Sequence, residues 1–188
     1  MLNKDIKDIK FTDLLELQRQ LDEEIIKPRE NGFIPRKATL FDIRLALDDE
    51  FQEWLRELPN EYNFKVWKEK EYNRENELIE LVDVLFIFLK LFNFKNDKYD
   101  NEGMGYWFDN FREDCDLLDL PKTVLYFKEG LWSDDLTETD FYISFIRWIE
   151  ICRLRGFTKE EVIQAYIKKW KYNIGERPNG DWSLGGNK

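Results

Sequence analysis

The sequence predicts an all-α protein, and three observations support this fold class. Apolar side chains recur every three or four residues in several segments, which is the spacing of one helix face. Helix-start residues such as Thr39 and Thr158 precede these segments, and Pro59 and Gly156 follow them. The sequence has neither an alternating strand pattern nor an internal repeat. With 188 residues, we expect a helical bundle that forms one domain, residues 1–188.

The first half of the chain is expected to hold three long helices and one short one. Thr12 is a good N-cap for the first helix, which must end before Pro28. Thr39 opens the second helix, and Pro59 stops it. The third and fourth helices carry aromatic and aliphatic side chains at helical spacing. The four expected ranges are 12–27, 39–58, 61–71 and 74–93.

The second half begins with a less regular segment, residues 94–137, in which Asn, Asp, Gly and aromatic residues are mixed. We interpret this segment as an insertion with one or two short helices, for example at 105–118. Two further helices are expected at 138–155 and 158–173, because Gly156 ends the first and a capping box from Thr158 to Glu161 opens the second. The Gly- and Asn-rich tail, 175–188, is expected to be irregular.

Composition narrows the possible partners and the cellular location. The net charge of −10 argues against binding to duplex nucleic acid or to an anionic membrane surface. The longest apolar stretch, residues 78–92, is interrupted by Glu80, Asp83 and Lys90, so it is a poor membrane span. The first residues contain no apolar signal region, and only two cysteines occur. We therefore expect a protein of the cytoplasm.

The chain contains no histidine. This excludes catalysis by Ser-His-Asp or Cys-His systems, and it excludes zinc or iron sites with histidine ligands. Two cysteines are also too few for a four-cysteine zinc site. Any proton transfer or metal binding must therefore depend on carboxylates.

Two acidic motifs offer such carboxylates. Glu50 and Glu53 lie three residues apart, as do Glu80 and Asp83, so each pair shares one face of its helix. The second pair lies in a nearly continuous apolar run, where an ionised carboxylate is costly unless it is paired or binds a metal. Four converging carboxylates would form an oxygen-only site that suits Mg²⁺ or Mn²⁺.

Two alternatives compete with this interpretation. The spacing also occurs at other acidic pairs in this acidic chain, and such pairs usually form a solvated helix face. Asp83 could instead form a buried ion pair with Lys65, Lys68 or Arg44. Glu77, one turn before Glu80, is expected to be solvated.

The order of the motifs resembles the all-α nucleoside triphosphate pyrophosphatases. Glu50-x-x-Glu53 is followed by 26 residues and then by Glu80-x-x-Asp83. Similar pieces precede, separate and follow these motifs: Leu14-Leu-Glu-Leu-Gln18, Phe64-Lys65-Val-Trp67-Lys68, and Ala165-Tyr166-Ile-Lys-Lys169-Trp-Lys-Tyr-Asn173-Ile-Gly-Glu-Arg177. Within this superfamily the chain looks most like dimeric dUTPases and bacteriophage dCTP/dUTP pyrophosphatases. The similarity covers about 12–93 and 157–182.

The resemblance implies roles for individual residues. Glu50, Glu53, Glu80 and Asp83 would hold two or more Mg²⁺ ions, and Glu50 or Glu53 would be the catalytic base. Gln18 would recognise the pyrimidine, or else be a solvent-facing helical residue. Trp67 would lie near the base or sugar, or else pack in the core. Lys65 and Lys68 would contact phosphate, or else be ordinary surface lysines. Lys169, Asn173 and Arg177 would bind phosphate, or else form a basic helix end favoured by the helix dipole. Arg177 follows Asn173 by four residues, whereas the family pattern has three.

The implied activity is Mg²⁺-dependent hydrolysis of dUTP to dUMP and pyrophosphate by a homodimer, with Mn²⁺ as an alternative ion. Hydrolysis of dCTP as well, or of a wider range of non-canonical nucleotides, is the nearest alternative. A non-catalytic acidic protein that binds a partner through exposed aromatic residues is the alternative from another class.

Overall fold

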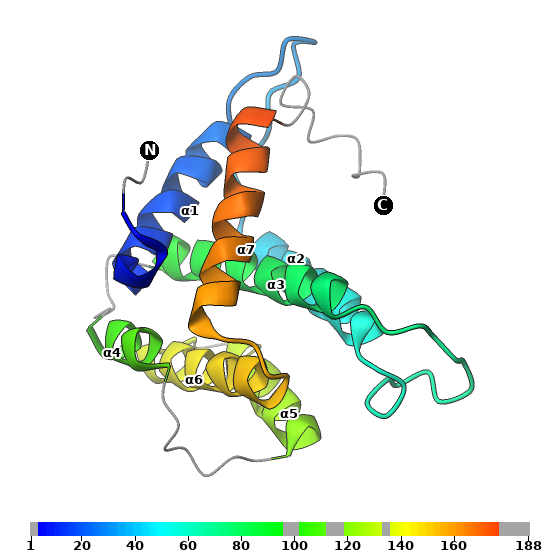
Figure 1. Cartoon of the computed structure of the whole chain (residues 1–188). Helices are drawn as coiled ribbons and strands as arrows, with labels where there is room; N and C mark the ends of the chain where they lie inside the picture. The colour runs from blue at the N-terminus through cyan, green and yellow to red at the C-terminus, as the bar shows by residue number, and fades with distance from the viewer. Residues whose placement is uncertain (1–3, 96–101, 112–118, 133–135, 177–188) are drawn as a thin grey trace.

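The computed structural model describes residues 4–95, 102–111, 119–132 and 136–176. All regular structure within these ranges is helical, so the predicted all-α class is confirmed (Figure 1). A short 3₁₀ turn precedes the first helix, and a π-helical turn follows the last. The elements are the turn Ile6–Asp8, α1 (Phe11–Ile25), α2 (Leu40–Glu57), α3 (Arg74–Lys95), α4 (Glu102–Asn110), α5 (Leu120–Leu131), α6 (Glu138–Leu154), α7 (Lys159–Lys171) and the turn Tyr172–Glu176.

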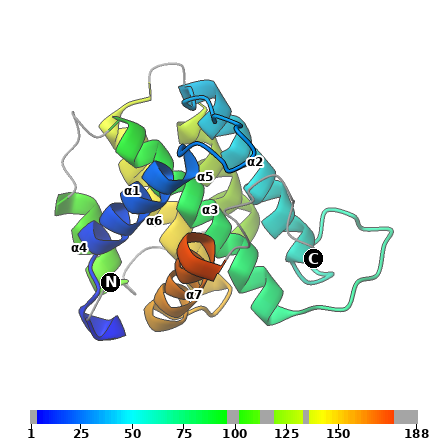
Figure 2. The ribbon, with the colours of Figure 1, turned by 90° about the horizontal axis from the view of Figure 1, so that it is seen from above.

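Helix α3 is the centre of the fold. It contacts α1, α2 and α7, and the view from above shows it between α2 and α7 (Figure 2). This position explains the nearly continuous apolar run in the sequence, because side chains on several sides of α3 are buried. None of the described helices is both long enough and apolar enough to cross a membrane.

Aromatic side chains fill the core beside α3. Phe145 on α6 is fully buried, and its ring lies 4.8 Å from the ring of Phe11, 5.5 Å from that of Phe88 and 6.1 Å from that of Trp148 between centroids. Each such residue removes a large apolar area from water. Many of the aromatic residues in this chain therefore stabilise the core.

The predicted helix starts at Thr39 and Thr158 are confirmed, since each hydroxyl accepts a hydrogen bond from the third helical amide. The predicted cap at Thr12 is wrong, because Thr12 lies inside α1. The Asp13 carboxylate reaches back to the amide of Lys10 at 2.9 Å, so the helix begins one residue before Thr12. This earlier start places Phe11 in the core.

The predicted helix at 61–71 is also wrong, because residues 58–73 form turns, bends and chain without regular secondary structure. Asparagine side chains in this loop bind backbone amides that a helix would need. The Asn63 side chain accepts a bond from the amide of Lys65 at 2.9 Å, and the Asn60 side chain accepts one from the amide of Lys70 at 3.1 Å. Such local bonds compete with helix formation.

The segment 94–137 contributes two helices to the core. Phe108 on α4 and Phe127 on α5 are both buried, and Phe127 stacks on Phe51 of α2 with ring centroids 5.2 Å apart. The expectation of one or two short helices is confirmed, although α4 ends at Asn110, earlier than the expected 105–118. The Asp119 side chain caps the N-terminus of α5.

Candidate metal centre

The two acidic motifs face each other across the contact between α2 and α3. Carboxylate oxygens of Glu50, Glu80 and Asp83 lie within 4.8 Å of one another. Glu53 is half-buried on α2, and its negative charge helps to raise the pKa of both Glu50 and Asp83. The structure therefore brings three predicted ligands together, with the fourth close enough to act on them electrostatically.

Burial of these carboxylates and the repulsion between them favour the binding of a cation. Burial, followed by the charge of Asp83, raises the pKa of Glu50 to about 7. Burial likewise raises the pKa of Asp83 to about 6, although the positive charge of Lys169 opposes the shift. A divalent cation would compensate this concentration of charge, and oxygen-only donors suit Mg²⁺ or Mn²⁺. The residues present therefore fit a hard divalent ion.

Asp83 forms an ion pair with Lys169 on α7. This partner differs from the three considered from the sequence, which were Lys65, Lys68 and Arg44. Lys65 and Lys68 lie on the loop 58–73, whereas α7 crosses α3 next to Asp83. The Asp83 side chain is 10% exposed and that of Lys169 is 33% exposed, so the lysine enters the cluster from its solvent side.

The expectation that Glu77 is solvated is wrong. Glu77 is fully buried, and its carboxylate accepts bonds from Arg155 at 2.6 and 3.1 Å and from the Tyr72 hydroxyl at 2.7 Å. Because Arg155 follows α6 and supplies a fixed positive charge, the carboxylate can be buried without a metal. Glu77 therefore belongs to a structural ion pair that fixes the start of α3.

Gln18 on α1 is buried, so the solvent-facing alternative is wrong. Its amide nitrogen donates to Asp22 at 3.0 Å, and its amide oxygen accepts a bond from the Tyr166 hydroxyl at 3.4 Å. The ring of Tyr166 stacks on Phe86, one turn beyond Asp83 on α3, with centroids 4.1 Å apart. Gln18 thus lies in a polar network on the α1–α3–α7 side of the bundle.

The loop 58–73 carries the three predicted contacts between the acidic motifs. The Trp67 side chain is 79% exposed, so the alternative of core packing is wrong. Lys68 is exposed as well, whereas Lys65 is half-buried with its ammonium 5.7 Å from the Phe64 ring centroid. These residues lie on the surface, while the carboxylates lie between two packed helices.

The C-terminal residues of the predicted phosphate-binding set are described in part. Lys169 is in the last turn of α7, and Asn173 is half-buried in the π-helical turn that follows. Arg177 lies outside the described residues.

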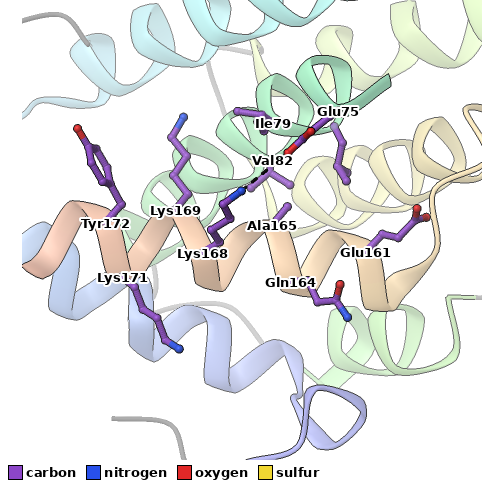
Figure 3. Close-up of a pocket in the computed structure, with 11 residues that line it drawn as sticks. Glu75, Ile79, Val82, Glu161, Gln164, Ala165, Lys168, Lys169, Lys171 and Tyr172 are labelled. Carbon is purple, nitrogen blue, oxygen red and sulfur yellow. Dashed lines mark ion pairs between the residues drawn. The ribbon is translucent and has the colours of Figure 1, made fainter. Parts of the chain in front are cut away.

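A groove of about 620 Å³ between α3 and α7 adjoins the carboxylates, and sequence reasoning missed it (Figure 3). Its apolar lining includes Ile79, Val82 and Ala165, and the lysines of the last turn of α7 lie along it. Lys169 belongs both to the groove and to the carboxylate cluster. The run of lysines was the available sequence signal, but it did not reveal the apolar surface beside it.

Comparison with known proteins identifies the family. A family model described as dUTPase matches residues 10–180. The chain belongs to the dUTPase family. The match includes the segment 94–137, for which the motif resemblance had no counterpart. A search of curated proteins found no match.

Membership of the dUTPase family defines the reaction class. The chain is a dUTP diphosphatase, a hydrolase that converts dUTP to dUMP and pyrophosphate. The dUTPase family generally uses a divalent metal, and the carboxylate cluster supplies suitable ligand atoms. This finding decides between the enzyme and the non-catalytic alternative in favour of the enzyme.

Proposed function

We propose that this dUTPase family member hydrolyses dUTP at the cluster of Glu50, Glu53, Glu80 and Asp83, which would hold two or more Mg²⁺ ions. The convergence of three carboxylates within 4.8 Å carries the proposal. Bound Mg²⁺ would supply an acidic water and positive charge for the phosphates, and Mn²⁺ would be an alternative ion.

Side chains of the protein would accept the proton of the attacking water and bind the phosphates. Glu50 or Glu53 would accept the proton of the attacking water, because a carboxylate is the available base in a chain without histidine. The raised pKa of Glu50, about 7, supports this role near neutral pH. Lys169 would bind the phosphates, as would Asn173 and, by its place in the motif, Arg177.

Gln18 and residues of the loop 58–73 are the proposed contacts to the nucleoside. Gln18 would recognise the edge of the pyrimidine. It lies beside Tyr166 of α7, the helix that also carries Lys169. Lys65, Trp67 and Lys68 would approach the nucleotide from the loop 58–73. An amide can pair with either uracil or cytosine, so dCTP is the second candidate substrate.

We also propose a homodimer in the cytoplasm. Phe41 and Leu45 lie one turn apart on α2 with 64% and 47% of their surface exposed, an apolar pair that a second copy would cover. The scarcity of cysteine fits a reducing compartment, and the net charge of −10 argues against duplex nucleic acid or an anionic membrane as partner.

Pyrophosphate release from dUTP, dCTP, dTTP and UTP, each with Mg²⁺ or with EDTA, tests the substrate and the ion. Asp83→Ala should abolish release and leave the helical circular dichroism intact. Glu16→Ala is the matched control, because Glu16 lies on the surface of α1 with its side chain 52% exposed. Near-normal turnover by Asp83→Ala would refute the site, and release from dCTP as well would broaden the substrate range.

A further inference from the structure

The ammonium of Lys169 occupies the position of a cation among the carboxylates. It donates to an oxygen of Asp83, and Asp83 is one of the three residues whose oxygens lie within 4.8 Å of one another. An ammonium and a metal ion that share the Asp83 carboxylate would repel each other. Metal binding at Asp83 is therefore weaker while Lys169 stays at this position.

The structure offers Lys169 a second location. Lys169 also lines the α3–α7 groove, and its side chain is one-third exposed on a flexible four-carbon stem. Lys169 and Tyr172 extend from the same side of α7, whereas Lys171 points to the other side (Figure 3). An ammonium that left Asp83 could move along this side of α7 toward solvent.

The charges around Lys169 determine whether its movement away from Asp83 is favourable. The neighbouring Lys168 is positively charged and forms an ion pair with Glu75 at 3.8 Å. A displaced Lys169 would exchange a buried carboxylate partner for a more solvated position near another lysine. A triphosphate in the groove mouth would reverse this balance, because its oxygens would give the ammonium a new anionic partner.

We propose that Lys169 is an internal counter-ion, which holds Asp83 in the substrate-free enzyme and weakens metal binding until a triphosphate arrives. The inference rests on the proposed metal site. Metal and nucleotide binding are then positively coupled, and the coupling must be reciprocal. The enzyme would thus assemble its metal centre with the nucleotide and leave it weakly occupied beforehand.

Binding of Mn²⁺ to metal-stripped protein tests the proposal without any turnover. The free ion is followed by electron paramagnetic resonance at a fixed pH, without nucleotide. Lys169→Met removes the charge and keeps an apolar stem, and we expect it to bind Mn²⁺ about tenfold more tightly than wild type. Lys169→Arg, which keeps the charge, should retain wild-type affinity. Lys168→Met is the matched control for net charge and should change affinity less than twofold.

A second titration measures the coupling. A dUTP analogue with an imido bridge between the α and β phosphates should tighten Mn²⁺ binding to wild type more than to Lys169→Met. Equal or weaker Mn²⁺ binding by folded Lys169→Met than by wild type would overturn the inference.

Asp83→Ala separates this failure from failure of the metal site. If Asp83→Ala loses Mn²⁺ binding while Lys169→Met shows no gain, only the counter-ion role is wrong. If wild type, Lys169→Met and Asp83→Ala all fail to bind Mn²⁺ with or without the analogue, the proposed metal site is wrong, and the inference falls with it.

Discussion

Replacement of Arg155 by Met should destabilise the fold by about 3–5 kcal/mol, because it leaves a buried carboxylate without its counter-ion. Glu77 is fully buried, and the change removes two charge-assisted hydrogen bonds of 2.6 and 3.1 Å. The bond from the Tyr72 hydroxyl remains. The guanidinium also lies 5.3 Å from the Tyr62 ring centroid, a contact worth about 0.5–1 kcal/mol.

Equilibrium urea unfolding, followed by tryptophan fluorescence and circular dichroism, measures this loss. The double variant Glu77→Met with Arg155→Met should recover most of it, because apolar replacement of both partners leaves no buried charge. Arg19→Met is the control, since Arg19 pairs with Glu16 on the surface of α1, and it should cost about 0–1 kcal/mol. If Arg155→Met lost no more stability than this control at an unchanged m-value, the reasoning about the buried pair would be refuted.

Three further predictions concern the core, the pH response and the assembly. Phe145→Ala should cost about 3–5 kcal/mol in urea unfolding because it empties the centre of the aromatic core, and a loss under 1 kcal/mol would contradict this. The bonds from Arg74, the largest cause, hold the pKa of Glu161 at about 2, so its stabilisation is present above pH 4.5 and disappears as the pH falls toward 2. The gap in unfolding free energy between wild type and Glu161→Gln, about 1 kcal/mol at pH 7, should therefore close over that window, and a constant gap would contradict the assignment. Phe41→Glu should halve the mass measured by light scattering if α2 forms the dimer contact, and an unchanged dimer would exclude this face.

The sequence predicted the helices with strong local signals and missed features that depend on distant partners. Thr39 and Thr158 cap their helices because the necessary hydroxyl and amide lie three residues apart. The sequence predicts a solvated Glu77 because its counter-ion, Arg155, is 78 residues away in the chain. Apolar spacing predicts a helix at 61–71 because it does not take account of the hydrogen bonds between asparagine side chains and backbone amides.

The same distinction applies to the carboxylate cluster. Spacing put Glu50 beside Glu53 and Glu80 beside Asp83 on two helix faces, but it could not show that these faces meet. The family resemblance supplied that expectation, and the contact between α2 and α3 brings three of the four residues together. The pairing of Asp83 with Lys169 depends on how α7 crosses α3, and this crossing cannot be predicted from the local sequence.

The π-helical turn Tyr172–Glu176 has a consequence for how this C-terminal motif tolerates changes in length. A π turn closes its hydrogen bonds over five residues where an α turn uses four, so it holds one additional residue per turn. The turn can therefore accommodate one additional residue near Gly175. In that interpretation, the four-residue interval after Asn173 is a length variant of the family pattern, and deletion of Gly175 would return the turn to α-helical form.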